Sequence, residues 1–579
     1  MNKFLILLLF ACHIFNANAI EKDVAETSKT RVAPLRSSSV SNYAQKIVVS
    51  SLKELKSFVE QYQSEKNSSW TLVQLKKGHY TIQDTDKKYF SLRKASNLVI
   101  DFNNSQIVFK KPAGLAQLVK CNNIIIKNAV IDFDPIPYTQ GYVDAVDHKK
   151  KQVRVTVKKG WPIPDNRFRK MGKNWMLIKD AQIVGRQKRG CQNVYTINKD
   201  WQSVGENAYV VNFITRTTNI EVGDKVVHLG PGGGNCFSLN DTHQITLENI
   251  TQYAGGVFVG AQRANATNLI SCKVTIKPET DRWHSLTRDI MIERDARIGP
   301  WIENCIFEAN GDDGINLHTK GFKIIKRLSD FELLVGPEMN QFKRLNAVYL
   351  NRNDSIVIFD NKLGRKYFEA AISELTSNEK GCYTVRFKKK LPEFPNIEEK
   401  YPNIDSRYEA WNTAVICPGF VIQNNTFKHQ RRFGLLTLSK NGIIEGNKFI
   451  GSSANAIYMG FLEELSDIGQ MSGNIYIRNN IFDDCFLQDK RPSTKMQASA
   501  INITLPKRPD KSQSPYSFFQ NIVIANNSFK NFKQPFPIVR VHNTNESKVE
   551  NNRFSNCFEN GNYIETKAGN VKVLNNVKE

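Results

Sequence analysis

A short pattern of residues recurs along most of this 579-residue chain. Each copy alternates apolar and polar residues, passes through one or two asparagines and ends in another apolar pair, as in segments 97–102, 123–131, 244–250, 420–427, 443–449, 475–482 and 522–529. Copies lie about 20 to 30 residues apart and lack a helical stripe, which is typical of solenoid coils. The pattern predicts an all-β fold, a right-handed parallel β-helix with asparagines at its turns and Ile, Val, Leu and Phe inside. A leucine-rich repeat is disfavoured because its fixed Leu-x-x-Leu-x-Leu spacing is absent.

The repeat is interrupted twice, and each interruption contains alternating strands joined by Asp/Gly turns. Such segments are typical of small antiparallel barrels, so we expect two inserted β-barrel domains. Segment 51–63 is amphipathic, with Ser51 as a candidate N-cap and Glu54 at the capping-box spacing, and predicts a short helix that covers the first coil. The expected domains are a signal peptide at 1–19, a flexible lead-in at 20–45, coils with the capping helix at 46–134, a barrel at 135–234, coils at 235–320, a second barrel at 321–414 and coils at 415–579.

The N-terminus has the features of a secretory signal. A basic start is followed by the apolar run 4–11 and by the small residues Ala17-Asn18-Ala19. The apolar run is too short to span a bilayer, so we expect cleavage after residue 19 and a secreted or periplasmic protein without a membrane span. A lipid anchor at Cys12 is the alternative.

The charge and cysteine content of the chain limit the classes of molecule that it is expected to bind. The formal net charge of +24 favours polyanions, which outside a cell include acidic or sulfated glycans. Lys and Arg are spread over several loops and no nucleic-acid module is present, so nucleic acid is disfavoured. The nine cysteines after Cys12 lack Cys-x-x-Cys spacing, which argues against a zinc site and favours small apolar fillers, with one or two disulfides left open. A homodimer is an alternative to the monomer.

Two adjacent carboxylates, Asp312 and Asp313, interrupt one of the repeats between Gly311 and Gly314. Neighbours on a flat strand point to opposite faces, so both can serve one site only if the backbone bends there, as the glycines would permit. Asp289 precedes Asp312 by 23 residues, close to one coil, which would stack the carboxylates ~4.8 Å apart. Three carboxylates suit inverting glycoside hydrolysis, with Asp289 as general acid and the Asp312/Asp313 pair as base. A solvated Asp-Asp-Gly turn and a structural ladder of aspartates are the alternatives.

At these residues the chain resembles glycoside hydrolase family 110, the secreted exo-acting α-1,3-galactosidases. The resemblance rests on segments 221–224, 232–234, 253–260, 303–308 and, above all, 311–318. It implies inverting removal of terminal α-1,3-linked galactose from glycans, without a metal or another cofactor. Where the family tends to show Ala-Asp-Gly-x-His around the acid, this chain has residues 288–292 without that Gly and His, so Glu293 or Asp295 is the reserve acid.

Other polar and aromatic residues near this region are candidates for substrate binding: Trp283, His318, Arg431 and Arg432. Polygalacturonases of family 28 also place an Asp one coil from an Asp-Asp pair, but their Gly-His-Gly and Arg-Ile-Lys signatures are absent. A polysaccharide lyase acting on acidic sugars, which the net charge would suit, and a non-catalytic glycan-binding solenoid are the remaining alternatives.

Overall fold

The computed structural model describes residues 31–579 apart from 64–68, 84–86, 165–174, 192–193, 214–218, 231, 338–347, 361–364, 378–380, 395–407, 461–472, 489–496, 506–516 and 560. The predicted signal peptide and Cys12 lie outside the described residues. No helix in the described part of the chain is long and apolar enough to cross a lipid bilayer.

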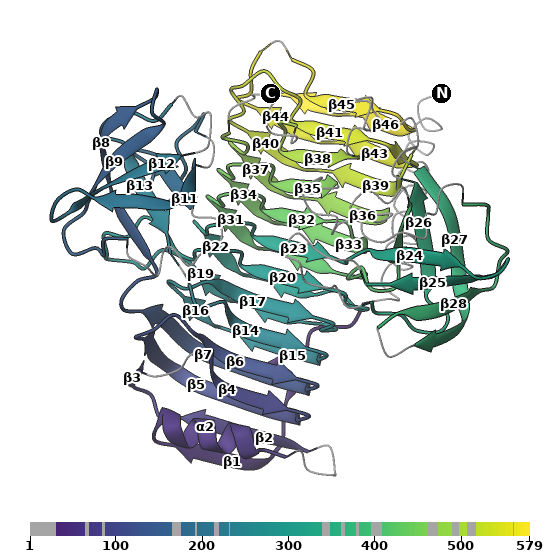
Figure 1. Ribbon diagram of the computed structural model, residues 1–579, viewed down its shortest axis with the longest axis horizontal. Helices are drawn as coiled ribbons and strands as arrows, with labels where there is room; N and C mark the ends of the chain where they lie inside the picture. The colour runs from purple at the N-terminus through teal and green to yellow at the C-terminus, as the bar shows by residue number, and fades with distance from the viewer. Residues whose placement is uncertain are drawn as a thin grey trace, which may run out of the picture.

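The main body is a parallel β-helix, as the repeat predicted (Figure 1). Strands of successive coils pair in parallel and in register, so that each coil lies directly on the previous one. Two faces of the solenoid are connected into one 24-stranded sheet, and the third face is a separate 11-stranded sheet. Alternate residues of each strand point inward, where they form one continuous apolar core along the solenoid.

The strands of the 11-stranded sheet are β4 (Lys88–Arg93), β6 (Gly114–Val119), β14 (Asn235–Asn240), β17 (Val257–Gln262), β20 (Met291–Arg294), β23 (Ile315–His318), β32 (Leu435–Thr437), β35 (Ile457–Gly460), β38 (Ile501–Thr504), β41 (Val539–His542) and β45 (Ile564–Lys567). The first face of the other sheet contains β1 (Tyr43–Val49), β2 (Trp70–Leu75), β5 (Ser96–Phe109), β7 (Asn122–Phe133), β15 (His243–Glu248), β18 (Asn268–Ile270), β21 (Trp301–Glu303), β30 (Val421–Gln423), β33 (Lys440–Glu445), β36 (Gly473–Arg478), β39 (Phe519–Ala525), β42 (Thr544–Asn545), β43 (Ser547–Glu550) and β46 (Val571–Leu574). Strands β5 and β7 continue onto its second face beside β3 (His79–Ile82), β16 (Thr251–Gln252), β19 (Lys273–Val274), β22 (Ile306–Glu308), β31 (Thr426–Lys428), β34 (Lys448–Ile450), β37 (Ile481–Asp483), β40 (Ser528–Lys530), β44 (Arg553–Ser555) and β47 (Val577–Lys578).

Asparagines organise one turn of the later coils. They come in pairs such as Asn479-Asn480 and Asn526-Asn527, in which the first residue takes a positive φ of 56–57° and the second is buried. A ladder of hydrogen-bonded amides runs through five buried asparagines and ends at a half-buried sixth: Asn425, Asn447, Asn480, Asn527, Asn552 and Asn576. The expectation that asparagine tolerates left-handed geometry and stacks between coils is confirmed.

The predicted capping helix is confirmed as α2 (Leu52–Gln61). The Ser51 side chain accepts a hydrogen bond from the Glu54 N–H, as expected for an N-cap. The buried face of the helix, with Leu55 and Val59 fully buried, joins the solenoid core at its first coil.

The described part of the lead-in differs from the predicted flexible segment. Residues 31–42, which include the short 3-10 helix η1 (Ser37–Ser39), lie along the outside of the solenoid. The Ser37 N–H donates to Glu248 at 2.8 Å, and Arg36 pairs with Glu303 in a later coil. Sequence reasoning missed these contacts because the partner carboxylates lie more than 200 residues away in the chain.

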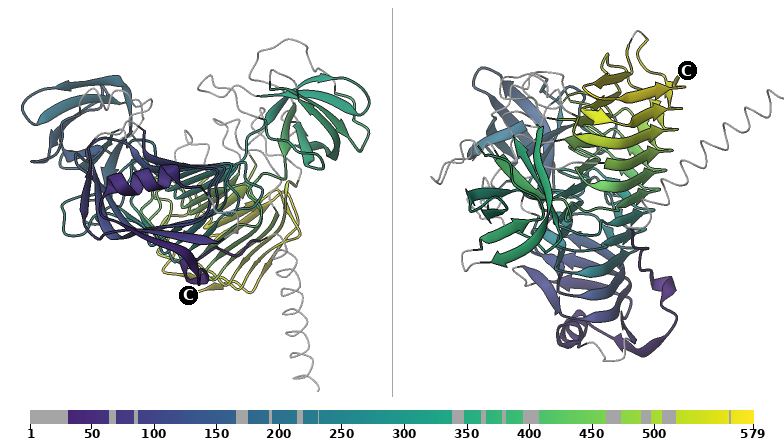
Figure 2. Two further views of the ribbon diagram at one scale, coloured as in Figure 1. Left: turned by 90° about the horizontal axis from the view of Figure 1, so that it is seen from below. Right: turned by 90° about the vertical axis from the view of Figure 1, so that its right-hand side faces the viewer.

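Both interruptions of the repeat are closed six-stranded antiparallel barrels, as predicted. The first contains β8 (Tyr138–Asp147), β9 (Gln152–Val157), β10 (Trp175–Lys179), β11 (Val194–Ser203), β12 (Ala208–Phe213) and β13 (Lys225–Leu229). The second contains β24 (Phe322–Arg327), β25 (Glu332–Gly336), β26 (Ser355–Asp360), β27 (Arg365–Ser377), β28 (Tyr383–Phe387) and β29 (Tyr408–Asn412). Figure 2 shows both barrels on the same side of the solenoid, and in Figure 1 the 11-stranded sheet lies between them.

Ion pairs attach the barrels to the coils. Arg186 of the first barrel pairs with Asp484 of the solenoid at 2.7 Å, and Arg297 of the solenoid pairs with Asp354 of the second barrel at 2.7 Å. These contacts fix the barrels on either side of the 11-stranded sheet (Figure 1).

The nine described cysteines are free thiols, and seven of them are buried, in agreement with their predicted role as small apolar fillers.

Candidate active site

The three predicted catalytic carboxylates lie where two neighbouring coils enter the 11-stranded sheet. Asp289 precedes β20, and Asp312 and Asp313 precede β23, which pairs with β20 in register. The Ile290 N–H donates to the Asp313 carbonyl oxygen at 3.1 Å, so the two turns are stacked directly on each other. The charges of Asp312 and Asp313 both act on Asp289, so the structure brings the three carboxylates together.

A buried asparagine shapes the turn that carries the aspartate pair. The Asn310 amide donates to the carbonyl oxygens of Asp312 at 3.0 Å and Asp313 at 2.8 Å, and to that of Arg288 one coil earlier at 3.2 Å. These three bonds fold residues 311–313 back on themselves and attach them to the acid's coil. Sequence reasoning assigned no role to Asn310, although an asparagine directly before Gly-Asp-Asp-Gly was the available signal.

The two glycines of this turn act differently from the prediction. Neither Gly311 nor Gly314 has a positive φ, so the bend does not depend on left-handed geometry. A Cβ atom on Gly311 would lie 2.4 Å from the Thr287 carbonyl oxygen, and one on Gly314 would lie 2.3 Å from that of Gly434. Glycine is needed here because the neighbouring coils approach too closely for any side chain.

Burial and mutual repulsion raise the pKa of two of these carboxyls. Asp289 is 7% exposed, and burial, followed by the charges of Asp312 and Asp313, raises its pKa well above the ordinary value. Asp313 is 1% exposed, and its pKa is raised to about 7, chiefly by burial, while Arg432 opposes the shift. The cluster can therefore hold at least one proton near neutral pH, as an acid and base pair requires.

Two arginines from the following coil compensate the negative charge of Asp312 and Asp313. Arg431, with a side chain only 3% exposed, donates to Asp312 at 2.8 Å. Arg432 lies 3.7 Å from Asp313 and stacks over the ring of Phe433 at 4.8 Å. Both predicted binding residues thus contact the carboxylates, and Arg432, which is 23% exposed, keeps access to solvent.

A short chain of hydrogen bonds links the base to the outer face of the 11-stranded sheet. The Asn316 amide donates to Asp313 at 3.3 Å, and its oxygen lies 2.9 Å from Nδ1 of His318. Burial, with Arg294 and Lys320 nearby, lowers the pKa of His318 well below its usual value. His318 is therefore neutral, and its Nδ1–H donates to Asn316 in this assignment. Asn316, also missed by sequence reasoning, lies two residues before His318 on the same face.

Trp283 packs against the first barrel in a small apolar cluster that includes Leu229. Its side chain is 7% exposed and meets the ring of Tyr142 at 5.3 Å. The ammonium groups of Lys158 and Lys225 lie 5.3 and 5.5 Å from its ring centroid. These contacts make Trp283 part of the interface between the barrel and the solenoid, so no face of its ring is left open for a sugar.

The two reserve acids are also held elsewhere. Glu293 points into the solenoid beside Leu317, is fully buried, and has only a long 3.5 Å contact with Thr267. Asp295 is 6% exposed and accepts a hydrogen bond from Thr319 at 2.8 Å. Glu293 faces the core because it shares the inward phase of β20, which leaves Asp289 as the acid candidate.

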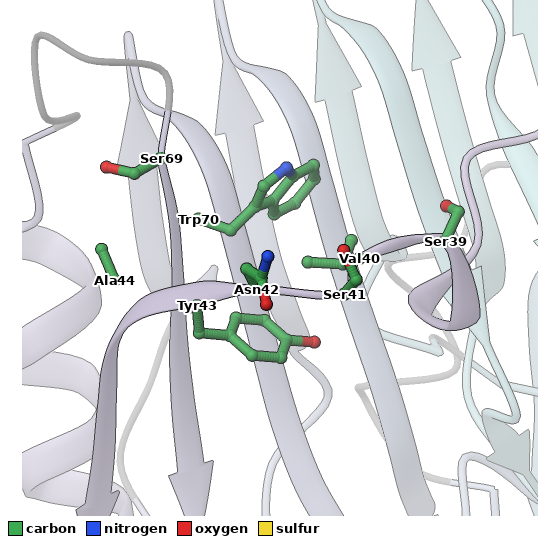
Figure 3. A pocket seen from close by; sticks show the side chains of 8 residues that line it. All are labelled: Ser39, Val40, Ser41, Asn42, Tyr43, Ala44, Ser69 and Trp70. Carbon is green, nitrogen blue, oxygen red and sulfur yellow. The ribbon is translucent and has the colours of Figure 1, made fainter.

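Two surface hollows lie away from the candidate site, and neither contains the three carboxylates. One of about 490 Å³ lies at the first coil (Figure 3), and the other, of about 370 Å³, lies beside Arg36 and Glu248. The first is lined by Ser39, Val40, Ser41, Asn42, Tyr43, Ala44, Ser69 and Trp70. It lacks titratable acids or bases suited to hydrolysis. Among the described residues, no group of three His, Cys, Asp or Glu side chains is arranged to hold a metal ion.

The overlaps of this fold with solved structures are weak. A glycoside hydrolase matches with a TM-score of 0.40 and 9% identity over 90% of both chains. An exopolygalacturonase from Thermotoga maritima matches with a TM-score of 0.38 and 9% identity over 96% of both chains. Overlaps of this size add nothing to the fold described above.

Sequence comparison gives a clearer result, although no protein-family model matches the chain. The chain is 25% identical over 481 residues to alpha-1,3-galactosidase A of Shewanella woodyi. This alignment covers 77% of this chain and 71% of that protein. It is 24% identical over 403 residues to alpha-1,3-galactosidase B of Bacteroides fragilis, covering 65% of each. It is 23% identical over 479 residues to alpha-1,3-galactosidase B of Phocaeicola vulgatus, covering 77% and 76%. These matches confirm the predicted resemblance: the chain is similar to α-1,3-galactosidases, the enzymes of glycoside hydrolase family 110, over much of its length.

Proposed function

We propose that this protein is an exo-acting, inverting glycoside hydrolase that releases terminal α-1,3-linked galactose from glycans. The observation that carries the proposal is the stacked cluster of Asp289, Asp312 and Asp313, in which burial and like charge raise the pKa of Asp289. Its similarity to α-1,3-galactosidases supports the linkage and the sugar.

In the proposed reaction, protonated Asp289 gives its proton to the glycosidic oxygen while the bond between that oxygen and C1 breaks. A water molecule attacks C1 from the opposite face and gives a proton to ionised Asp313. Asp312, held by Arg431, keeps negative charge beside the developing oxocarbenium ion. Asp289 then regains a proton and Asp313 loses one to solvent, so the cycle balances. No step calls for a metal or another cofactor.

Anomer-resolved proton NMR of α-1,3-galactobiose hydrolysis tests this proposal. We expect β-galactose as the first product, converting later to the equilibrium mixture by mutarotation. First formation of α-galactose would contradict inversion, and no galactose release would contradict hydrolysis. With longer chains, release of galactose alone supports the exo mode, whereas internal fragments would overturn it.

Two alternatives remain distinguishable in the same assay. A polysaccharide lyase would form unsaturated products that absorb in the ultraviolet, and a non-catalytic binding solenoid would retain glycan without cleaving it. The cluster favours hydrolysis because Asp289 is suited to donate a proton to a leaving oxygen.

The proposal also covers the location of the protein, the class of glycan that it acts on and its oligomeric state. The signal at 1–19 supports export to the periplasm or the cell exterior, and the net charge of +24 supports acidic or sulfated glycans as carriers of the galactose. A homodimer is the proposed alternative to a monomer, and light scattering of the mature chain distinguishes them.

A further inference from the structure

One arginine of the 11-stranded sheet, Arg294, forms no direct ion pair with a carboxylate in the part of the chain that the structure describes. Arg294 is the last residue of β20 and is half-buried on the outer face of the 11-stranded sheet. Within the described part of the chain, no hydrogen bond or ion pair joins its guanidinium to another residue, and its Nε is buried without a partner. By contrast, Arg431 and Arg297 each contact a carboxylate directly.

The neighbouring Asp295 makes no direct ion pair with Arg294, although the charge of Arg294 acts on that carboxyl. Asp295 follows Arg294 directly, but its side chain is buried and accepts a hydrogen bond from Thr319. The Arg294 side chain is only half-buried on the outer face of the sheet, so a ligand on that face can supply acceptors to its guanidinium. Arg294 is therefore suited to bind an anion.

The position of Arg294 relates it to the catalytic cluster. In β23, His318 lies directly opposite Arg294, and Asn316 links His318 to Asp313. Two hydrogen bonds and one amide group thus separate His318 from the proposed base, a span shorter than a disaccharide. This face of the 11-stranded sheet lies between the two barrels (Figure 1), so a sugar that extends over it from the carboxylates would pass Arg294 and His318.

We propose that Arg294 and His318 form a subsite for an acidic substituent, a sulfate or a carboxylate, on the sugar that the reaction releases as leaving group. The inference rests on the proposed hydrolase function and names its substrate class. A guanidinium presents two parallel N–H donors that match a sulfate or carboxylate. With Nδ1 donating to Asn316, His318 offers Nε2 as an acceptor for a hydroxyl of the same sugar.

Matched disaccharides test this subsite. The substrates are α-1,3-galactobiose, the same disaccharide sulfated on its reducing-end galactose, and one with galacturonic acid at that end. A charge-assisted contact favours the better acidic substrate by about tenfold in kcat/KM. Arg294→Gln should abolish this preference while changing kcat/KM for the neutral substrate by no more than about twofold. The two acidic substrates show whether sulfate or carboxylate is preferred.

A remote arginine provides the matched control. Arg93 occupies the same position across the 11-stranded sheet, related to Arg294 through Val119, Asn240 and Gln262 in the intervening strands. Arg93→Gln removes the same charge far from the carboxylates and should leave the preference intact. Added salt should weaken the preference of the wild type because Arg294 is partly exposed.

Binding measurements separate failure of the subsite from failure of the hydrolase proposal. Calorimetry with Asp313→Asn should show tighter binding of an acidic disaccharide than of the neutral one, and Arg294→Gln in that background should remove the difference. Equal binding of all three disaccharides would overturn the subsite even if hydrolysis occurs. An Arg294-dependent difference without hydrolysis by the wild type would support the subsite and refute the hydrolase.

Discussion

The buried asparagine ladder and the aspartate cluster are both stacks of like side chains, and their end groups differ in one atom, an amide nitrogen in place of a carboxyl oxygen. In the asparagine ladder, the Asn480 oxygen accepts from the Asn447 backbone and side chain, and its NH₂ donates to Ile444 and Asn527. At the entry to the 11-stranded sheet, Asp289 and Asp313 occupy matching positions in two successive coils, one before β20 and one before β23. An amide both donates and accepts, so a stack of amides is satisfied by itself.

Stacked carboxylates have no such solution. They must either hold a proton or find a cation, and the molecule uses both, with a raised pKa at Asp289 and Asp313 and an ion pair between Asp312 and Arg431. The same coil geometry therefore gives stability where the rungs are amides and acid and base groups where they are carboxyls.

The largest effect is expected when one carboxyl of the aspartate cluster is replaced by an amide. We expect Asp313→Asn to lower kcat by about 10³-fold or more, because the attacking water loses its base. Thermal unfolding should show no loss of stability, since the change removes a desolvated charge. Galactose release and a melting curve measure the two effects.

Asp312→Asn is the companion variant. It removes from the buried Arg431 a carboxylate 2.8 Å away, so we expect it to lower both activity and stability, the latter by about 3 kcal/mol. Equal stability of the two variants would contradict the assigned difference between the aspartates.

Removing an amide from the ladder gives the second largest effect. Asn480→Ala deprives the Asn447 N–H of its acceptor and the Ile444 carbonyl of its donor. We expect a loss of about 3 kcal/mol in the free energy of unfolding, with kcat/KM unchanged well below the melting temperature. Denaturant titration measures the loss, and a variant that impaired catalysis without destabilising the fold would argue against a purely structural ladder.

The pH dependence of activity tests whether Asp313 and Asp289 act as base and acid. Because Asp313 must lose a proton whose pKa is raised to about 7, kcat/KM should rise about tenfold per pH unit below that value. It should fall at higher pH, where Asp289 loses its proton. A rate profile over this range checks both limbs, and an acidic limb near pH 4 would show that Asp313 is not the base.

The smallest effect is expected at a second, exposed row of asparagines. Asn474 donates to Asn441 at 3.0 Å and accepts from Asn521 at 2.9 Å, but all three amides are solvent-exposed at these bonds. Water can replace a lost partner there, so Asn474→Ala should cost no more than about 0.5 kcal/mol. A loss as large as that of Asn480→Ala would mean that burial does not distinguish the two rows.

Much of the fold could be predicted because its signals are local. The Asn-Asn pairs, the Ser51 cap and the alternating strands each act within a few residues. The spacing between Asp289 and the aspartate pair also predicted stacking, since it is close to the 24 residues that separate the paired residues Met291 and Ile315.

The remaining features depend on contacts between distant segments. Glu293 faces the core because of its phase in β20, and Trp283 is covered by a barrel inserted more than 100 residues earlier in the chain. Gly311 is required by a carbonyl of the neighbouring coil, and Asn310 acts through that coil as well. None of these partners can be identified from residues adjacent in sequence.

An infrared titration of carboxyl groups tests the central claim most directly, because it needs no substrate. Protonated carboxyls absorb apart from carboxylates, so their loss can be followed as pH rises. The account predicts a protonated carboxyl that titrates near pH 7 and disappears in Asp313→Asn, and a second that ionises well above the range of an ordinary aspartate and disappears in Asp289→Asn. Complete ionisation of every carboxyl below pH about 5, at the values of ordinary aspartate and glutamate, would contradict it.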